Sequence, residues 1–321
     1  EAPLVMTLIC LILTTFGTPL SWKKTSLGDL NIWLGFLIHC GMGTVQAAMH
    51  RIPTLRMILH DIDNGTAAGE KDIERWAGIL NWATIAHVYL KPFMYHVYAW
   101  LAISRQRPRV TPPRALRTLA RAMLHLLDHP PATHEFYLQR TPLKGASDAA
   151  AYDADSDNLA CMGGWWTRDD WPTKNTCDWY SIKVARKHKW AYKQDSSQRR
   201  VAALELMGTL VLYKLITQQA PVGMAQTTTT LSTDNLGNTH GINKERFKKW
   251  PNCDIALELA LTAYSNGNRI NTRHVKRDAN QWADQLSNDD TTGFDPTRRH
   301  EFVLDDHRNW LLWHQLWDGP Q

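Results

Sequence analysis

The sequence predicts a mixed α/β domain that follows a mostly helical region, because the hydrophobic period changes along the chain. Between residues 51 and 130, apolar residues recur at helical spacing. From about 134 to 291, short β-rich segments alternate with helical ones in the order three strands, helix, strand, two helices, strand, helix. This order predicts a five-stranded mixed sheet with helices on its faces. The first and fourth strands should run parallel, because a helical crossover links them.

The first 50 residues predict a helix followed by a hairpin. The apolar run 2–16 lacks the basic residues of a signal peptide and is too short to span a bilayer comfortably. A buried helix that ends at Gly17 and Pro19 is therefore expected. Segment 31–38 predicts a strand, and residues 39–43 are turn formers.

Residues 51–130 predict a group of helices. Asn64-Gly65 separates the first two, Lys91-Pro92 begins a third, and the Pro-rich stretch 104–114 predicts a linker before the last. The helical spacing covers 52–62, 73–83, a segment after 91, and 115–127.

In the second region each element has a local signal. β-branched residues predict a strand in the threonine run before Asp234, and Asn235, Gly237 and Asn238 then open a helix. Apolar residues gathered mostly on one side of 197–219 predict a long helix. The expected strands are 143–152, 159–167, 178–185, 227–233 and 269–276, and the other expected helices are 237–247, 253–266 and 279–287.

The charge distribution is compatible with a polyanionic partner. The formal net charge is +5, and basic residues gather in three groups, at 105–121, 183–193 and 246–249. One such group alone is expected on an ordinary solvated face, whereas three in one chain favour nucleic acid. The predicted nucleic-acid contacts are Arg114, Arg117, Arg121, Lys187, Lys189 and Asn235.

The five cysteines are scattered and show no Cys-x-x-Cys spacing. This pattern argues for reduced thiols and against a zinc site. We therefore expect an intracellular protein, nuclear or cytoplasmic with an organelle not excluded, and no membrane partner.

Four acidic residues stand on four separate predicted elements, three of them among apolar neighbours. Asp148 lies in the first strand, Glu205 in the long helix, Asp234 at the end of the threonine strand and Asp284 in the last helix. Buried acids are costly unless they are paired or bound to metal. Their hard oxygen atoms suit Mg²⁺ or Mn²⁺, and two ions about 4 Å apart could clamp a phosphodiester.

Each of these acids also has a plainer interpretation. Asp234 could be a cap or turn residue, and Glu205 could be the partner of a buried salt bridge. Asp153 or Asp155 could replace Asp148 as the first acid, although both lie in a predicted turn of Asp, Ser and Asn.

Residues 134–291 resemble a ribonuclease H domain, in particular that of retrotransposon reverse transcriptases of the tyrosine-recombinase (DIRS-like) type and their protist relatives. The most specific motif is 274-HVKRDANQWADQLS-287, in which His274 and Asp284 are ten residues apart, although Gln285 replaces the usual Ala. The other matching motifs are Ser-Asp-Ala at 147–149, Gly-Gly-Trp at 163–165, 203-ALEL-206 and 233-TDNLGNT-239.

The resemblance implies roles for these residues. Asp148 would bridge two metal ions, Glu205 and Asp234 would hold the ion on the leaving-group side, and Asp284 the ion on the side of the attacking water. His274 would help to position water or release product, although it could also be a plain surface histidine.

The first region resembles the part of the same reverse transcriptases that follows the polymerase active site. In 19-PLSWKKTSLGDLNIWLGFLI-38 the motifs Trp-Lys-Lys and Trp-Leu-Gly-Phe look like the end of the palm and the primer-grip hairpin, and 70-EKDIERWAGILNWAT-84 looks like a thumb helix. No aromatic-x-Asp-Asp polymerase motif precedes them, so we expect that this chain cannot polymerise alone. The implied organisation is a palm remnant at 1–50, a thumb-like region at 51–130, a ribonuclease H-like domain at 131–291 and a tail at 292–321.

Two functions are therefore expected from the sequence. The first is metal-dependent cleavage of the RNA strand of RNA–DNA hybrids, with two Mg²⁺ or Mn²⁺ ions and weak sequence preference. The second is a catalytically silent or reused retroelement fragment that binds RNA or hybrids within a larger assembly, with the missing polymerase portion as another possible partner.

Overall fold

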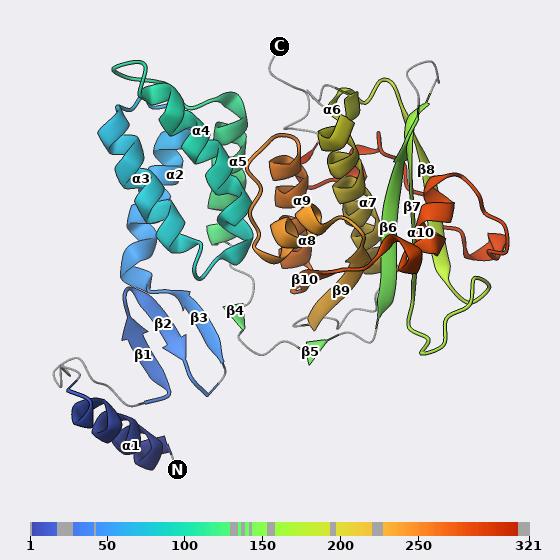
Figure 1. Cartoon of the computed structure of the whole chain (residues 1–321). Coiled ribbons are helices and arrows are strands. Elements are labelled where there is room, and N and C mark those ends of the chain that lie inside the picture. The colour runs from blue at the N-terminus through green and yellow to red at the C-terminus, as the bar shows by residue number, and fades with distance from the viewer. Residues whose placement is uncertain are drawn as a thin grey trace.

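The computed structural model contains a group of helices with a small sheet, beside a larger sheet domain (Figure 1). The residues that it describes are 2–17, 28–41, 43–128, 134–135, 139–140, 143–152, 158–192, 197–219 and 227–313. The Trp-Lys-Lys motif at 22–24 and the alternative first acids, Asp153 and Asp155, lie outside these residues.

The N-terminal helix α1 (Ala2–Thr15) forms as predicted, but the expectation that it is buried is wrong. Leu8, Leu11 and Phe16 are all largely exposed. In Figure 1 the helix lies apart from the other labelled elements, in agreement with the exposure of these side chains.

Strands β1 (Leu30–Trp33) and β2 (Phe36–His39) form an antiparallel hairpin, and β3 (Thr44–Ala47) and β4 (His134–Glu135) extend it. The single strand predicted over 31–38 is therefore wrong. Leu34 and Gly35 both have positive φ angles, 51° and 86°, and a two-residue turn of this kind reverses the chain in the middle of that segment. Leu34 accepts a hydrogen bond from the Trp82 indole, which fixes the tip against α3 (Glu70–Ala83).

The helical group has its own core. Ile58 and Ile62 of α2 (Ile52–Asp63), Trp76 of α3 and Trp100 of α4 (Met94–Ser104) are buried together with the apolar face of α5 (Arg114–Asp128). Short 3₁₀ turns η2 (Met49–Arg51) and η3 (Val88–Phe93) precede α2 and α4. The four α-helices agree with the predicted segments, because a regular apolar stripe is a strong local signal.

The larger sheet has the predicted mixed order. Its main path runs β10 (Arg269–His274), β9 (Thr227–Thr233), β6 (Lys144–Ala151), β7 (Asn158–Thr167) and β8 (Asp178–Ala185). Strands β6, β7 and β8 are antiparallel, whereas β9 runs parallel to both β6 and β10. The short strand β5 (Gln139–Arg140) also pairs with β9. The parallel pairing of the threonine strand with the first strand is confirmed.

Helices cover both faces of this sheet. The side chain of Met162 on β7 lies near α7 (Ser197–Gln219), whereas its neighbour Gly163 lies against α10 (Gln281–Ser287). Helix α9 (Asn252–Ser265) packs on α7, and α8 (Leu236–Asn243) packs against β10. The remaining short turns are α6 (Lys189–Tyr192) and η4 (Arg277–Ala279).

Helix α7 is the core of the domain. Among the described residues it is the one helix whose length and hydropathy would suit a membrane span, and 78% of that apolar window is buried inside the protein. Its apolar composition is thus explained by packing against β6, β7 and α9.

The helical group and the sheet domain share an apolar interface. Leu257 and Leu261 of α9 belong to the core of the helical group, where they meet residues such as Leu90 and Phe93. A cavity of about 600 Å³ lies along this interface, lined by residues of both parts including Ala47, Tyr89, Ala260 and Ile270.

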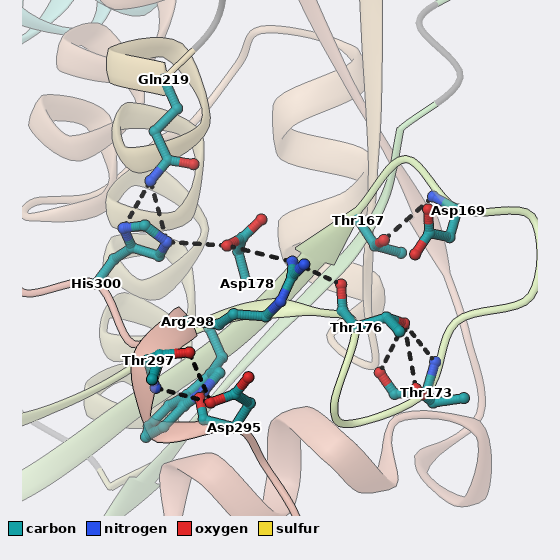
Figure 2. A network of polar contacts seen from close by, with 11 residues as sticks. Thr167, Asp169, Thr173, Thr176, Asp178, Gln219, Asp295, Thr297, Arg298 and His300 are labelled. Carbon is teal, nitrogen blue, oxygen red and sulfur yellow. Dashed lines mark hydrogen bonds and ion pairs between the residues drawn. The ribbon is translucent and has the colours of Figure 1, made fainter.

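The C-terminal segment 292–313 packs on the sheet domain, although the sequence assigned it to a tail. Trp310 and Trp313 lie in the same core as α7, and the segment includes the short turns η5 (Pro296–Arg298) and η6 (His307–Asn309). Figure 2 shows its contacts with the β7–β8 loop and the start of β8. Arg298 donates to the Thr176 carbonyl of the loop at 3.0 Å, and His300 bonds to Asp178, the first residue of β8, at 3.1 Å.

A buried carboxylate anchors the end of this segment. Glu258 of α9 accepts hydrogen bonds from the backbone N–H groups of Leu311, Leu312 and Trp313, at 2.7, 2.8 and 3.0 Å. The ammonium of Lys214 on α7 bonds to the same carboxylate at 2.8 Å. Glu258 is fully buried, and these donors compensate for the loss of its hydration.

Candidate functional site

Three of the four predicted acids meet at one end of the sheet. Asp148 comes from β6, Glu205 from α7, and Asp234 directly follows β9. The parallel pairing of Ala146 with Ser232 places Asp148, two residues further along β6, level with Asp234, two residues beyond Ser232. One carboxylate oxygen from each acid lies within 4.8 Å of the other two.

Burial and the charges of neighbouring acids disfavour the charged forms of Asp148 and Glu205. Burial raises the pKa of Asp148 to about 7, and the nearby charge of Asp234 adds to the effect. Burial likewise raises the pKa of Glu205 to about 8, against the opposing hydrogen bond from Asn235. A cation between them would remove this penalty, because it would favour the charged carboxylates.

An oxygen of Asp234 has an unusual environment. Its Oδ1 atom is buried and has no hydrogen-bond partner within the described part of the chain. A buried carboxylate oxygen without a donor is costly, and a bound cation would satisfy it. The donor set is made of hard oxygen atoms, so this cluster fits Mg²⁺ or Mn²⁺.

Asn235 joins two parts of the site. Its Oδ1 accepts a hydrogen bond from the backbone N–H of Asn238 at 2.8 Å and so caps α8. Its Nδ2 donates to Glu205 Oε2. The structure thus places this predicted nucleic-acid contact beside the acids, where it orients the Glu205 carboxylate.

Asp284 lies near the three acids but outside their group. Its carboxylate bonds to the guanidinium of Arg277 at 3.1 Å, and its charge contributes to the raised pKa of Asp148. Helix α10 can pack closely against β7 because Gly163, the residue of β7 that pairs with Asp148, has no side chain. A Cβ atom at Gly163 would lie 2.3 Å from the Leu286 carbonyl carbon.

His274 lies at the end of β10, next to the residue that follows β9. Its Nε2 atom is 3.1 Å from the backbone oxygen of Asp234, and its side chain is exposed. The structure therefore places the predicted histidine at the rim of the acid cluster.

A buried polar chain supports the site, and the sequence did not reveal it. Asn280 donates to the Ser147 carbonyl at 3.4 Å, and the Ser147 hydroxyl bonds to Thr209 at 3.0 Å. Thr209 in turn donates to the Glu205 carbonyl at 3.1 Å. These residues are buried. The sequence positions of these residues could have revealed them. Thr209 is one helical turn after Glu205, Asn280 is four residues before Asp284, and Ser147 directly precedes Asp148.

Arg277 was also missed, although it lies within the quoted motif 274–287. It is 79% exposed, and its charge lowers the pKa of Asp148 and of Glu205 as well as bonding to Asp284. It is therefore the basic residue at the mouth of the acid cluster.

The predicted basic contacts Arg114, Arg117, Arg121 and Lys187 are exposed, and three of them bond to acidic residues. Arg117 donates to the Asp63 carbonyl, and Arg121 bonds to the Asp63 carboxylate at 2.9 Å. Arg114 is exposed, and Lys187 pairs with Asp305. Lys189 begins α6. All these basic residues are distant in the sequence from the four acids, and the acid cluster does not include them.

The chain matches no known family model and no curated protein. Among solved structures it is similar to ribonuclease H1 of the archaeon Halobacterium salinarum NRC-1, with 13% identity, 46% of this chain and 96% of that chain covered, and a TM-score of 0.33. It is also similar to the N-terminal RNase H domain of a Mycobacterium tuberculosis protein, with 17% identity, 48% of this chain and 94% of that chain covered, and a TM-score of 0.32.

A foamy viral protease-reverse transcriptase, solved in complex with an RNA/DNA hybrid, is similar over 88% of this chain and 56% of that chain, with 10% identity and a TM-score of 0.32. Because these TM-scores are all below 0.5, the fold assignment rests on the strand order, strand directions and helix placement of this chain itself. These give the sheet domain the ribonuclease H-like fold: a mixed five-stranded sheet with flanking helices.

Proposed function

We propose that this chain cleaves the RNA strand of RNA–DNA hybrids with the help of two Mg²⁺ or Mn²⁺ ions. The observation that carries the proposal is the group formed by Asp148, Glu205 and Asp234, which includes the buried, unbonded Oδ1 of Asp234. Many other acids of the described residues lie in salt bridges or cap helices, whereas this oxygen has no donor among those residues.

The residues would share the work as follows. Asp148 belongs to the group with Glu205 and Asp234 and is also close enough to Asp284 to feel its charge, so it is the residue that would hold both ions. Bound ions would supply positive charge to the phosphodiester and would favour ionisation of the attacking water. Asn235 would hold Glu205 in place, and His274 at the rim would receive a proton or assist product release.

The wider context of this activity is also a proposal. The motifs between 147 and 287 support a retrotransposon reverse transcriptase of the tyrosine-recombinase type, or a protist relative, as the source. Its missing polymerase portion or a larger ribonucleoprotein would be the partner. Five free cysteines support an intracellular location.

The test is a cleavage assay with the purified chain on an RNA–DNA hybrid, with Mg²⁺, with Mn²⁺ and with EDTA. Cleavage of the RNA strand alone, abolished by EDTA and by Asp148→Asn, is expected. Asp170→Asn is the matched control, because that side chain is 92% exposed and remote in sequence from the cluster. If Asp148→Asn cuts at the wild-type rate, the assignment of the first acid is wrong.

A second candidate function is hybrid binding without catalysis. It is favoured by the ion pair between Asp284 and Arg277. In this pair the guanidinium of Arg277 takes the place that a metal ion would have at Asp284. In that case the wild-type chain would bind the hybrid but would not cleave it, either with Mg²⁺ or with Mn²⁺.

A further inference from the structure

A second group of metal-ligating side chains lies far from the acid cluster in the sequence. His96 comes from α4 of the helical group, and Cys253 and Asp254 come from the first turn of α9 in the sheet domain. One ligand atom from each residue lies within 4.8 Å of the other two. The group therefore bridges the two parts of the chain.

The distances within this group are close to those of a tetrahedral metal site. The Cys253 sulfur is 3.5 Å from Asp254 Oδ1, and His96 Nε2 is 2.6 Å from the same oxygen. Tetrahedral zinc with bonds of about 2.0–2.3 Å separates its ligand atoms by about 3.3–3.7 Å. The first pair already has this separation, and the second would need to open by about 1 Å or less.

The burial and charge of the group also suit a divalent ion. Cys253 is fully buried, Asp254 is 4% exposed and the imidazole is mostly covered. A thiolate and a carboxylate together carry two negative charges, which a divalent ion balances, and the thiol proton leaves to solvent on binding. Both acidic ligands lie in the first turn of α9.

The chemical types of the ligand atoms indicate which metal ion the group would bind. Thiolate and imidazole are borderline-soft ligands that prefer zinc, whereas the all-oxygen cluster at Asp148 suits magnesium. The cysteine pattern had argued against a zinc site, since spacing rules detect ligands that are close in the sequence. His96 is 158 residues from Asp254.

We propose that His96, Cys253 and Asp254 form a zinc site that fastens the helical group to the sheet domain. The fourth position is left to water or another small ligand. The site lies beside the apolar interface that α9 shares with the helical group, so the ion links two parts that already pack together. It is independent of the proposed nuclease activity.

The test is a titration of the metal-free, full-length protein with Co²⁺, a spectroscopic substitute for zinc. We expect one bound Co²⁺ per chain to give a thiolate-to-cobalt charge-transfer band, and Zn²⁺ to displace this ion; Co²⁺ held by the acid cluster gives no such band. Cys253→Ser should abolish the band and weaken binding at least tenfold. Cys161→Ser is the matched control, because that buried cysteine contacts Ser181 and belongs to no metal-ligating group among the described residues.

A thermal melt separates this site from the acid cluster. Zn²⁺ should raise the unfolding midpoint of the wild type, of Cys161→Ser and of Asp148→Asn equally, and should leave that of Cys253→Ser unchanged. If Cys253→Ser does not fold, the presence or absence of the thiolate-to-cobalt band in the wild-type protein alone decides whether the site exists. The proposal is overturned if stoichiometric Co²⁺ gives no thiolate band, or if the band survives in Cys253→Ser. In either case His96 and Asp254 are a plain hydrogen-bonded pair.

Discussion

Asp148→Asn should stabilise the metal-free protein, even though it should abolish cleavage. The folded protein raises the pKa of Asp148 from 3.8 to about 7, a difference of about three units. Each unit corresponds to about 1.36 kcal/mol, so the charged carboxylate costs up to about 4 kcal/mol of folding free energy. Asparagine removes that charge from a place where burial and Asp234 both oppose it.

The difference in stability between Asp148→Asn and the wild type should depend on pH. Because the folded state binds the proton of Asp148 more tightly than the unfolded state does, wild-type stability is lost as the pH rises from about 4 to about 7. At pH 8 the full cost is present, and we expect Asp148→Asn to be more stable by about 1–4 kcal/mol. Near pH 4 the two proteins should be almost equally stable.

The measurement is urea unfolding in EDTA at pH 4 and pH 8, repeated with Mg²⁺ at pH 8. Magnesium should stabilise the wild type, because it binds only the folded state, and should reverse the order of the two proteins. Asp170→Asn should behave as the wild type throughout. The reasoning fails if Asp148→Asn is the less stable protein at pH 8 without metal, or if Asp170→Asn gains as much.

Three other changes have definite expected results. Glu258→Gln should lower the free energy of unfolding by about 3–5 kcal/mol, measured by denaturant titration, because it leaves the Lys214 charge buried without its partner; a loss below 1 kcal/mol would contradict the role of this pair. Arg277→Ala should lower the Mg²⁺ concentration needed for half-maximal thermal stabilisation, since the guanidinium competes for Asp284; an unchanged midpoint would mean that it does not compete. Neutralising three arginines of α5 to Gln should weaken hybrid binding and flatten its dependence on salt, and an unchanged slope would leave them as a solvated face. These three are Arg114, Arg117 and Arg121.

The sheet domain could be predicted from sequence because its signals are local. Five of the seven residues of β9 are β-branched threonines, and the predicted helix 197–219 coincides with α7. The four acids were found because each stands on its own element and, Asp234 apart, among apolar neighbours. The proximity of Asp148 and Asp234 then follows from the parallel pairing of β9 with β6.

The remaining features depend on contacts that no local pattern encodes. The turn at Leu34 required an apolar residue to adopt a positive φ angle, which its identity does not suggest. The exposure of α1 depends on what packs against it, and its composition alone predicted burial. The contacts of Arg277 with Asp284 and of Asn280 with Ser147 depend on the packing of α10 against Gly163.

The anchoring of the C-terminal segment by Glu258 has a consequence for how the protein is made. The chain is synthesised from its N-terminus, so α7 and α9 exist before the backbone donors of residues 311–313 do. Glu258 is 55 residues from Trp313, which corresponds to about 3–11 seconds of translation. Throughout that interval the carboxylate lacks three of its donors, and the core that surrounds the long helix lacks Trp310 and Trp313. The sheet domain would therefore close only when the last described residues have left the ribosome.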